Sequence, residues 1–247
     1  MLLVHGVTSD SGTWWRIGPA IAATGRRVIA MDLPGHGRTT RWRGRHRFSE
    51  TAEDVRDLID ALGLERTGVA ILAHSWGARV AAALPAAGVA PRPLILLDPP
   101  ALTLAELEAM THDPEEAPLR AVADAIPLLR AAHPDWSDGD VLAKAESLAL
   151  YDREAVRAIL LGNGAWDAGL EQLRQPSSAA VDVWLLRGDP TSGSLTRDDL
   201  LSAFQERLGP DHLVTIRGAG HGPHRTHPVE TVAAVRRALG DDAARLL

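Results

Sequence analysis

Short apolar runs alternate with amphipathic stretches along most of the chain. Six runs rich in Val, Ile and Leu lack regular polar alternation, which is typical of strands covered on both faces of a sheet. These candidate strands are residues 2–4, 27–32, 68–73, 93–98, 181–187 and 212–217. Helical periodicity fills several of the intervals between them. The alternation predicts an α/β fold, a mostly parallel sheet of about six strands with helices on both faces.

Three helical stretches also carry start or stop signals. Residues 50–63 place their apolar side chains on one face and end at a glycine. Residues 196–209 have the same design and begin at Thr196, a candidate N-cap. Residues 227–240 put Pro228 in the first turn, where its missing N–H costs little. We expect these three helices to cover the sheet.

Residues 99–180 depart from this rhythm. They show no strand pattern, only helical segments over 103–110, 115–132, 137–150 and 152–162. A stretch of about 80 residues is too long for a single crossover between strands. We therefore predict a helical cap, or lid, inserted after the strand ending at Asp98. The remaining residues, 1–98 and 181–247, would form the core.

Composition and charge narrow the class of protein. Hydrophobic residues make up 45% of the chain and charged residues 23%, as in an average soluble globular protein. Lys144 is the only lysine. A net charge of −6 argues against nucleic acid as a partner. There is no cysteine, no basic leader, and no apolar run near the roughly 18 residues that a membrane span needs. We expect a cytoplasmic protein without a membrane partner.

Polar residues gather where the predicted strands end. Open parallel sheets bind ligands beyond the carboxyl ends of their strands. In chain order, the polar residues at or just after these ends are His5, Asp32, Ser75, Asp98, Asp189 and His221. A serine, an aspartate and a histidine thus meet at one edge, in the order expected for a serine nucleophile on such a sheet.

Five motifs at these positions resemble landmarks of the α/β-hydrolase family, over nearly the whole chain. They are LLVHG (2–6), DLPGHG (32–37), AHSWG (73–77), LLRGDP (185–190) and GAGHG (218–222). They are similar to the family's oxyanion strand, the turn after the next strand, the nucleophile elbow, the acid loop and the histidine loop. The resemblance implies a serine hydrolase that needs neither a cofactor nor a metal.

The resemblance assigns the nucleophile to Ser75, on a tight strand–turn–helix that exposes its Oγ. Residues two positions away must be small because helix and strand approach closely there. Gly77 meets this requirement, and so does Ala73, although the family more often has a glycine at that position. The alternative reading of Ser75 is a plain helix N-cap.

His221 is the expected general base and Asp189 the acid that orients it. Asp98 is the alternative acid, since some relatives carry the acid one strand earlier, and otherwise it would be a structural residue at the mouth of the lid. His224 is the reserve base. His221, His224 and His227 are spaced by three, but they lack a fourth ligand or a carboxylate pair, so we expect no metal.

The family pattern further implies an oxyanion hole built from the backbone N–H groups of Val7 and Trp76. The Trp76 side chain would either line the acyl pocket or pack beneath the lid. Four further residues are expected at the substrate pocket, namely His5, His74, Trp136 and Trp166.

A serine at the elbow argues against epoxide opening and dehalogenation, because such relatives use an aspartate there. We therefore predict hydrolysis of a small ester-like substrate through an acyl-enzyme. The same triad could instead hydrolyse a lactone, a thioester or a C–C bond, or act as a perhydrolase. A ligand-binding member without activity is a further alternative.

Two surface features complete the predictions. Asp32 should hydrogen-bond the backbone of its loop, and the basic run at 38–48, which includes Arg41, Arg43 and Arg45, is either a solvated surface or an anion-attracting rim. Relatives usually begin with a β-hairpin before the strand at residues 2–4, so we expect either that the hairpin is absent or that the start codon is misassigned. If the hairpin is absent, the strand edge so exposed is expected to be covered in a homodimer.

Overall fold

The structure is a computed structural model that describes residues 1–39, 44–112, 121–166, 170, 173, 179, 181–204, 208 and 211–241. Its strands are β1 (Leu2–Val4), β2 (Ile29–Met31), β3 (Ile71–His74), β4 (Leu94–Leu97), β5 (Val183–Gly188) and β6 (Leu213–Ile216). Within the described residues they form one sheet in the order β2-β1-β3-β4-β5-β6, and every neighbouring pair is parallel. The predicted fold class is confirmed.

Successive residues of the central strands pack on opposite faces of the sheet. Leu2 and Val4 of β1 belong to one apolar cluster and Leu3 to a second. In β4, Leu94 joins the first cluster and Ile95 the second. All five side chains are completely buried, because strand residues alternate between two faces that are both covered. This is why the strand sequences lack polar alternation.

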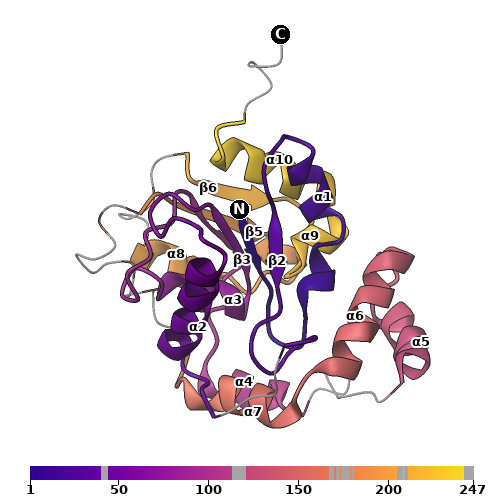
Figure 1. The fold of residues 1–247 in the computed structure, drawn as a ribbon. Coiled ribbons are helices and arrows are strands. Elements are labelled where there is room, and N and C mark those ends of the chain that lie inside the picture. Colours follow the sequence, from indigo (N-terminus) through magenta and orange to yellow (C-terminus); the bar gives the residue numbers. More distant parts are fainter. Residues whose placement is uncertain are drawn as a thin grey trace.

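Helices supply the second layer on each face (Figure 1). The sheet face on which Leu3 lies (the Leu3 face) is covered by α1 (Ile17–Ala22) and α10 (Pro228–Ala238). The opposite face, on which Leu2 lies (the Leu2 face, with the Leu2 cluster), is covered by α2 (Phe48–Ala61), α3 (Trp76–Ala82) and α8 (Asp198–Phe204). The predicted helices over 50–63 and 227–240 are therefore present. The end of the predicted stretch 196–209 lies largely outside the described residues. Among the described residues, no helix is long and apolar enough to cross a bilayer.

Between β4 and β5, the described residues form four α-helices joined by turns and loops, and none of them forms a strand. These helices are α4 (Leu104–Met110), α5 (Val122–Ala132), α6 (Asp138–Leu150) and α7 (Arg153–Gly162). Helices α4 and α7 pack on the Leu2 cluster, whereas α5 and α6 lie side by side around a small apolar cluster of their own, away from the sheet (Figure 1). The first part of the predicted segment 115–132 lies outside the described residues. The division into core and cap stays a prediction.

Several short helices were not predicted. They are α1 and the one-turn elements η1 (Ser11–Trp14), η5 (Pro190–Ser192) and α9 (Pro223–Thr226). Segments of one or two turns are too short to show a helical hydrophobic period. Three of these four elements, η1, η5 and α9, follow the carboxyl ends of strands and so lie in the loops that build the site.

Candidate active site

Ser75 lies at a strained turn between β3 and α3. Its backbone angles are φ 55° and ψ −126°, in a region that residues other than glycine rarely adopt. The Ser75 amide continues the sheet by donating to the Leu97 carbonyl at 3.0 Å, while its side chain makes no helix-capping bond. Ser75 thus occupies the N-cap position of α3, as the alternative reading had it, but its hydroxyl does not cap the helix. The turn lifts the hydroxyl out of the sheet.

Two glycines make this turn possible. A Cβ at Gly77 would collide with the His5 carbonyl oxygen, because α3 begins directly against β1. A Cβ at Gly6 would lie 2.9 Å from the Ser75 Cβ and 3.4 Å from Oγ. The backbone of residues 5–7 therefore passes beside the Ser75 hydroxyl. Ala73 is accommodated within β3 and completely buried.

The structure brings an imidazole and a carboxylate to that hydroxyl. His221 Nε2 lies 2.9 Å from Ser75 Oγ, and His221 Nδ1 lies 2.7 Å from Asp98 Oδ2. The carboxylate can only accept, so Nδ1–H donates to Asp98 and Nε2 is left to accept the Ser75 proton. Asp98 is fully buried, whereas His221 is 30% exposed in its side chain. The three groups form a continuous hydrogen-bonded chain.

Asp98 is held in an ionised state by His221 and by donors at the end of β5 and in the loop that follows it. Its Oδ1 accepts from the Gly188 amide at 2.9 Å and the Ser194 hydroxyl, and its Oδ2 accepts from the Leu195 amide at 2.9 Å. Burial acts to raise the pKa of Asp98, but the hydrogen bonds from His221, Ser194 and Leu195 outweigh it and hold the pKa below its usual value. The role of Ser194 was not predicted, because nothing in the sequence marks a contact across 96 residues.

Asp189 does not occupy the position predicted for it. Its Oδ1 accepts from the Thr191 amide at 2.9 Å and hydroxyl at 2.7 Å, and its Oδ2 accepts from the Gly218 amide at 3.1 Å. These bonds lower the pKa of Asp189 and tie the start of η5 to the loop that carries His221. The prediction that Asp189 orients His221 is therefore wrong. Asp98, the alternative acid, contacts the imidazole, and Asp189 stabilises the loop that carries His221.

The two predicted oxyanion donors flank Ser75. Trp76 is the first residue of α3, and helix N-termini leave their first amides without intrahelical partners. Val7 directly follows Gly6, whose backbone lies against Ser75. Both positions are compatible with amides that converge on an oxygen bound next to Ser75 Oγ. Their role in an oxyanion hole stays a prediction.

His5, expected at the pocket, is instead a structural residue. It is completely buried, its Nδ1 donates to the Gly6 carbonyl at 2.7 Å, and its Nε2 accepts from the Leu33 amide at 2.9 Å. Both nitrogens are thus committed, and burial lowers the pKa of the ring. The prediction of a pocket role is wrong, because both ring nitrogens of His5 are used to join the end of β1 to the turn after β2.

His74 and His224 form a second layer behind His221. His74 Nε2 donates to the His221 carbonyl at 2.8 Å, and the His74 ring lies 4.8 Å from the His221 ring and 4.5 Å from that of His224. His224, the reserve base, bonds Thr13 at 2.9 Å instead. Burial lowers the pKa of both His74 and His224 well below the usual histidine value. His74 therefore supports the loop that carries His221, and its place at a substrate pocket stays a prediction.

Trp166 and Trp76 are core residues, whereas Trp136 lies nearer the surface. Trp166 is buried and packs edge-on against Phe48 at 5.3 Å, so its predicted place at the pocket is wrong. Trp76 is also buried and stacks on His36 at 5.2 Å, which favours packing over lining the acyl pocket. Trp136 is half-buried, with the Arg225 guanidinium 4.6 Å from its ring centre. It joins the α5–α6 pair to α9.

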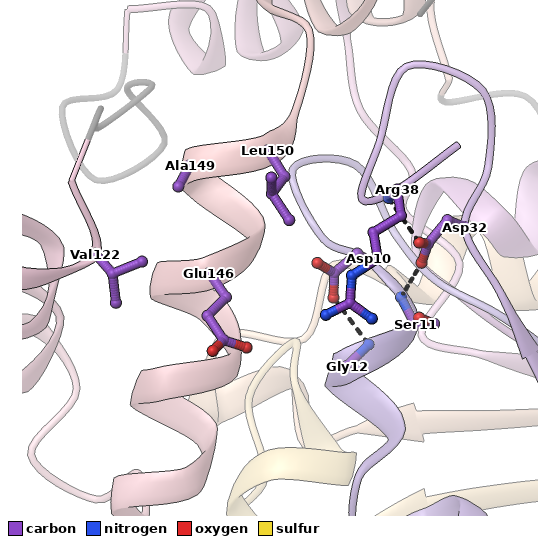
Figure 2. Close-up of a pocket in the computed structure, with 9 residues that line it drawn as sticks. All are labelled: Asp10, Ser11, Gly12, Asp32, Arg38, Val122, Glu146, Ala149 and Leu150. Carbon is purple, nitrogen blue, oxygen red and sulfur yellow. Dashed lines mark hydrogen bonds between the residues drawn. The ribbon is translucent and has the colours of Figure 1, made fainter. Parts of the chain in front are cut away.

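A cavity of about 260 Å³ lies between α6 and the loops that follow β1 and β2 (Figure 2). Asp32 lines it and accepts from the Ser11 and Arg38 amides, each at 2.8 Å, which confirms that it hydrogen-bonds the loop backbone.

Of the predicted basic rim, Arg41 and Arg43 lie outside the described residues, and Arg45 pairs with Glu53 at 2.9 Å. The described residues contain no metal-binding group of three or more ligands.

Comparison with known proteins agrees with this architecture. The model of a family described as "Alpha/beta hydrolase family" matches residues 1–235. Lipase LipV of Mycobacterium tuberculosis is 28% identical over 97% of this chain and 93% of its own length. The dihydrolipoyllysine-residue acetyltransferase component of the acetoin cleaving system of Pseudomonas putida is 41% identical over 92 residues, which are 37% of this chain. The chain thus matches only about a quarter (24%) of that relative.

Among solved structures, E-2-(acetamidomethylene)succinate hydrolase superposes with a TM-score of 0.75. The superposition covers 97% of this chain and 91% of the other, at 24% sequence identity. Similarity at this level of identity shows a common fold and carries no statement about the substrate.

Proposed function

The chain belongs to the alpha/beta hydrolase family, and from that premise we propose that it is a serine hydrolase that cleaves carboxylic esters through an acyl-enzyme. The observation that carries the proposal is the chain of contacts from Asp98 through His221 to Ser75, at 2.7 and 2.9 Å. Hydroxyl and base lie within hydrogen-bond reach, and a third group orients the base. This is the arrangement that activates a serine.

In the proposed acylation step, the Ser75 proton moves to His221 Nε2 as Oγ bonds to the ester carbonyl carbon. The carbonyl electron pair moves onto its oxygen, and the Val7 and Trp76 amides would donate to the oxyanion. Each such donor is worth about 3 kcal/mol of barrier. Asp98 stabilises the imidazolium. When the carbonyl re-forms, the alcohol leaves with the proton that His221 returns.

Deacylation repeats the same proton transfers with water in place of serine. His221 takes a proton from water, the hydroxide oxygen bonds to the acyl carbon, and Ser75 leaves with the proton from the imidazolium. A carboxylic acid is released and the enzyme is restored. Besides the ester and one water molecule, the two steps use only the chain's own residues.

Two observations support acyl transfer and an ester substrate. Residue 75 is a serine, so a hydroxyl rather than a carboxylate attacks, which argues for an acyl-enzyme and against epoxide opening or dehalogenation. LipV, which is similar over nearly its whole length, carries the name of a lipase. Lactones and thioesters react through the same acyl-enzyme and are the nearest alternatives. A purely ligand-binding role would leave the aligned Asp98–His221–Ser75 contacts without a purpose.

The test is hydrolysis of p-nitrophenyl esters of increasing acyl length, with a matching thioester and lactone, by the intact chain and by Ser75→Ala. We expect turnover of at least one ester and a fall in kcat of about 10⁴-fold or more in the variant. Turnover of the thioester or lactone alone would redirect the assignment to that bond. Equal rates for both proteins would refute the role of Ser75.

A further inference from the structure

The chain's only lysine is buried against the turn that follows Val7. Lys144 lies on α6 with 5% of its surface exposed, and its Nζ donates to the Thr8 hydroxyl at 2.9 Å and the Thr8 carbonyl at 3.2 Å. Lysine is almost never buried without partners, since removing an ammonium from water is unfavourable. The position of Lys144 therefore indicates a specific task at this turn.

Thr8 has a conformation that needs support. It is buried and has φ 54°, in the left-handed region, where a β-branched residue is strained. Its hydroxyl accepts from Lys144 and donates to the Val7 carbonyl at 2.7 Å. The ammonium, the hydroxyl and the carbonyl thus form one chain of hydrogen bonds. This chain fixes the Val7 carbonyl and so the Val7–Thr8 peptide plane, which adjoins the Gly6–Val7 peptide that carries the Val7 N–H.

The Val7 backbone is where such precision matters. Its amide is an expected oxyanion donor, and the preceding residue, Gly6, lies directly against Ser75. A donor lowers the barrier only if it is already aimed at the place where charge develops. A small rotation at Val7 or Thr8 would therefore reduce catalysis while leaving the fold intact.

Helix α6 contacts the segment that follows β1 through the side chains of Asp140 and Lys144. Near its start, Asp140 accepts from the Trp15 indole at 3.1 Å and pairs with Arg16. One turn further, Lys144 reaches Thr8. Beyond Lys144 the helix and the loop separate around the cavity, where Glu146 and Leu150 line the α6 side (Figure 2). The lysine thus links α6 to Thr8, the residue that directly follows Val7.

We propose that Lys144 is a positioning residue for the oxyanion hole, which acts through the Thr8 hydroxyl to hold the Val7 amide. The proposal rests on the proposed function, because an oxyanion hole has a purpose only if an acyl group is transferred. It also gives α6, a helix of the predicted cap, a role in the candidate active site.

The test compares Lys144→Met, Thr8→Val and the double variant, with Thr8→Ser as the variant that keeps the hydroxyl. Ser147→Ala is the matched control, since Ser147 is buried on the same helix and its hydroxyl bonds only within it, to the Ala143 carbonyl at 2.8 Å. The readouts are kcat and KM on the best ester, and amide hydrogen exchange of peptides that cover residues 5–9.

We expect Lys144→Met to lower kcat about tenfold or more and to change KM less than about threefold, because a transition-state contact is misaligned. Thr8→Val should give a similar loss, the double variant should be no worse than the poorer single variant, and Thr8→Ser and Ser147→Ala should stay near the parent rate. Exchange at residues 5–9 should accelerate in Lys144→Met and not in Ser147→Ala.

Three results would overturn the proposal: losses that multiply in the double variant, a change confined to KM, or unchanged exchange at residues 5–9. Failure of the proposed function has a different signature. If the parent chain cleaves no ester, the exchange comparison still decides whether Lys144 holds the turn.

Discussion

The buried carboxylate of Asp98 stays ionised because donors surround it. Its pKa is held below the usual aspartate value, chiefly by the His221 hydrogen bond once the effect of burial is overcome. The carboxylate is therefore charged at every pH above the acidic range, and it loses its charge only as the pH falls through that lowered pKa. A loss of activity on mild acidification, between pH 7 and 5, would not reflect protonation of Asp98.

His36 shows the opposite behaviour, since burial keeps it neutral. The ring is completely buried, and burial together with the nearby His5 lowers its pKa to about 3. Between that pH and the ordinary histidine pKa of about 6.5, the unfolded chain binds a proton that the folded chain does not. Neutral His36 therefore does not lower the free energy of unfolding above about pH 6.5, but it lowers it increasingly as the pH falls below that value.

We expect His36→Phe to flatten the pH dependence of stability. Near pH 5.5 the free energy of unfolding should depend on pH less steeply in the variant than in the parent, by about 1.2 kcal/mol per pH unit. This difference corresponds to the uptake of about nine-tenths of a proton by His36 on unfolding. Urea unfolding between pH 7 and 5 measures this slope, and His112→Gln, at an exposed histidine, is the control that should keep it. An unchanged slope in His36→Phe would show that His36 is protonated equally in both states.

Helix α3 and strand β1 meet so closely that only glycine fits at the second position of the helix. A Cβ at Gly77 would collide with backbone, which cannot rotate away as a flexible side chain can. Gly18 is the second residue of α1, and a Cβ there would meet only the Leu3 side chain at 3.6 Å. The two glycines hold equivalent places in their helices and differ in what they face.

We expect Gly77→Ala to lower the free energy of unfolding by about 1–3 kcal/mol through overpacking, and to reduce kcat because the elbow shifts. Gly18→Ala should be neutral or stabilising by up to about 1 kcal/mol, since alanine favours the helix. Urea unfolding of both variants measures the difference. Equal stability of the two variants would mean that the elbow tolerates displacement.

At the scale of the whole molecule, the parallel sheet brings together residues from three distant strands. Ser75 and His221 are 146 positions apart, and Asp98 and His221 are 123 apart. The strand pattern predicted this edge, and the motifs around Ser75 and His221 predicted the two side chains that meet there. This much of the site could be read from the sequence because local chemistry and strand order determine it.

The choice between Asp98 and Asp189 could not be read in that way. Both residues follow buried strands at the same edge, so spacing treats them alike. The decision depends on the φ of 46° at Asp98 and on donors from residues 188–195, none of which has a local signature. The misplaced roles of His5 and Trp166 have a similar cause, since burial is a property of the assembled molecule.

The most direct test of the account compares kcat/KM for Asp98→Asn and Asp189→Asn on the same ester, with folding checked by near-UV circular dichroism. The account predicts a fall of about 10³–10⁴-fold for Asp98→Asn, because the amide no longer stabilises the imidazolium, and a change within about threefold for Asp189→Asn. A large loss in Asp189→Asn together with a nearly unaffected Asp98→Asn would contradict it.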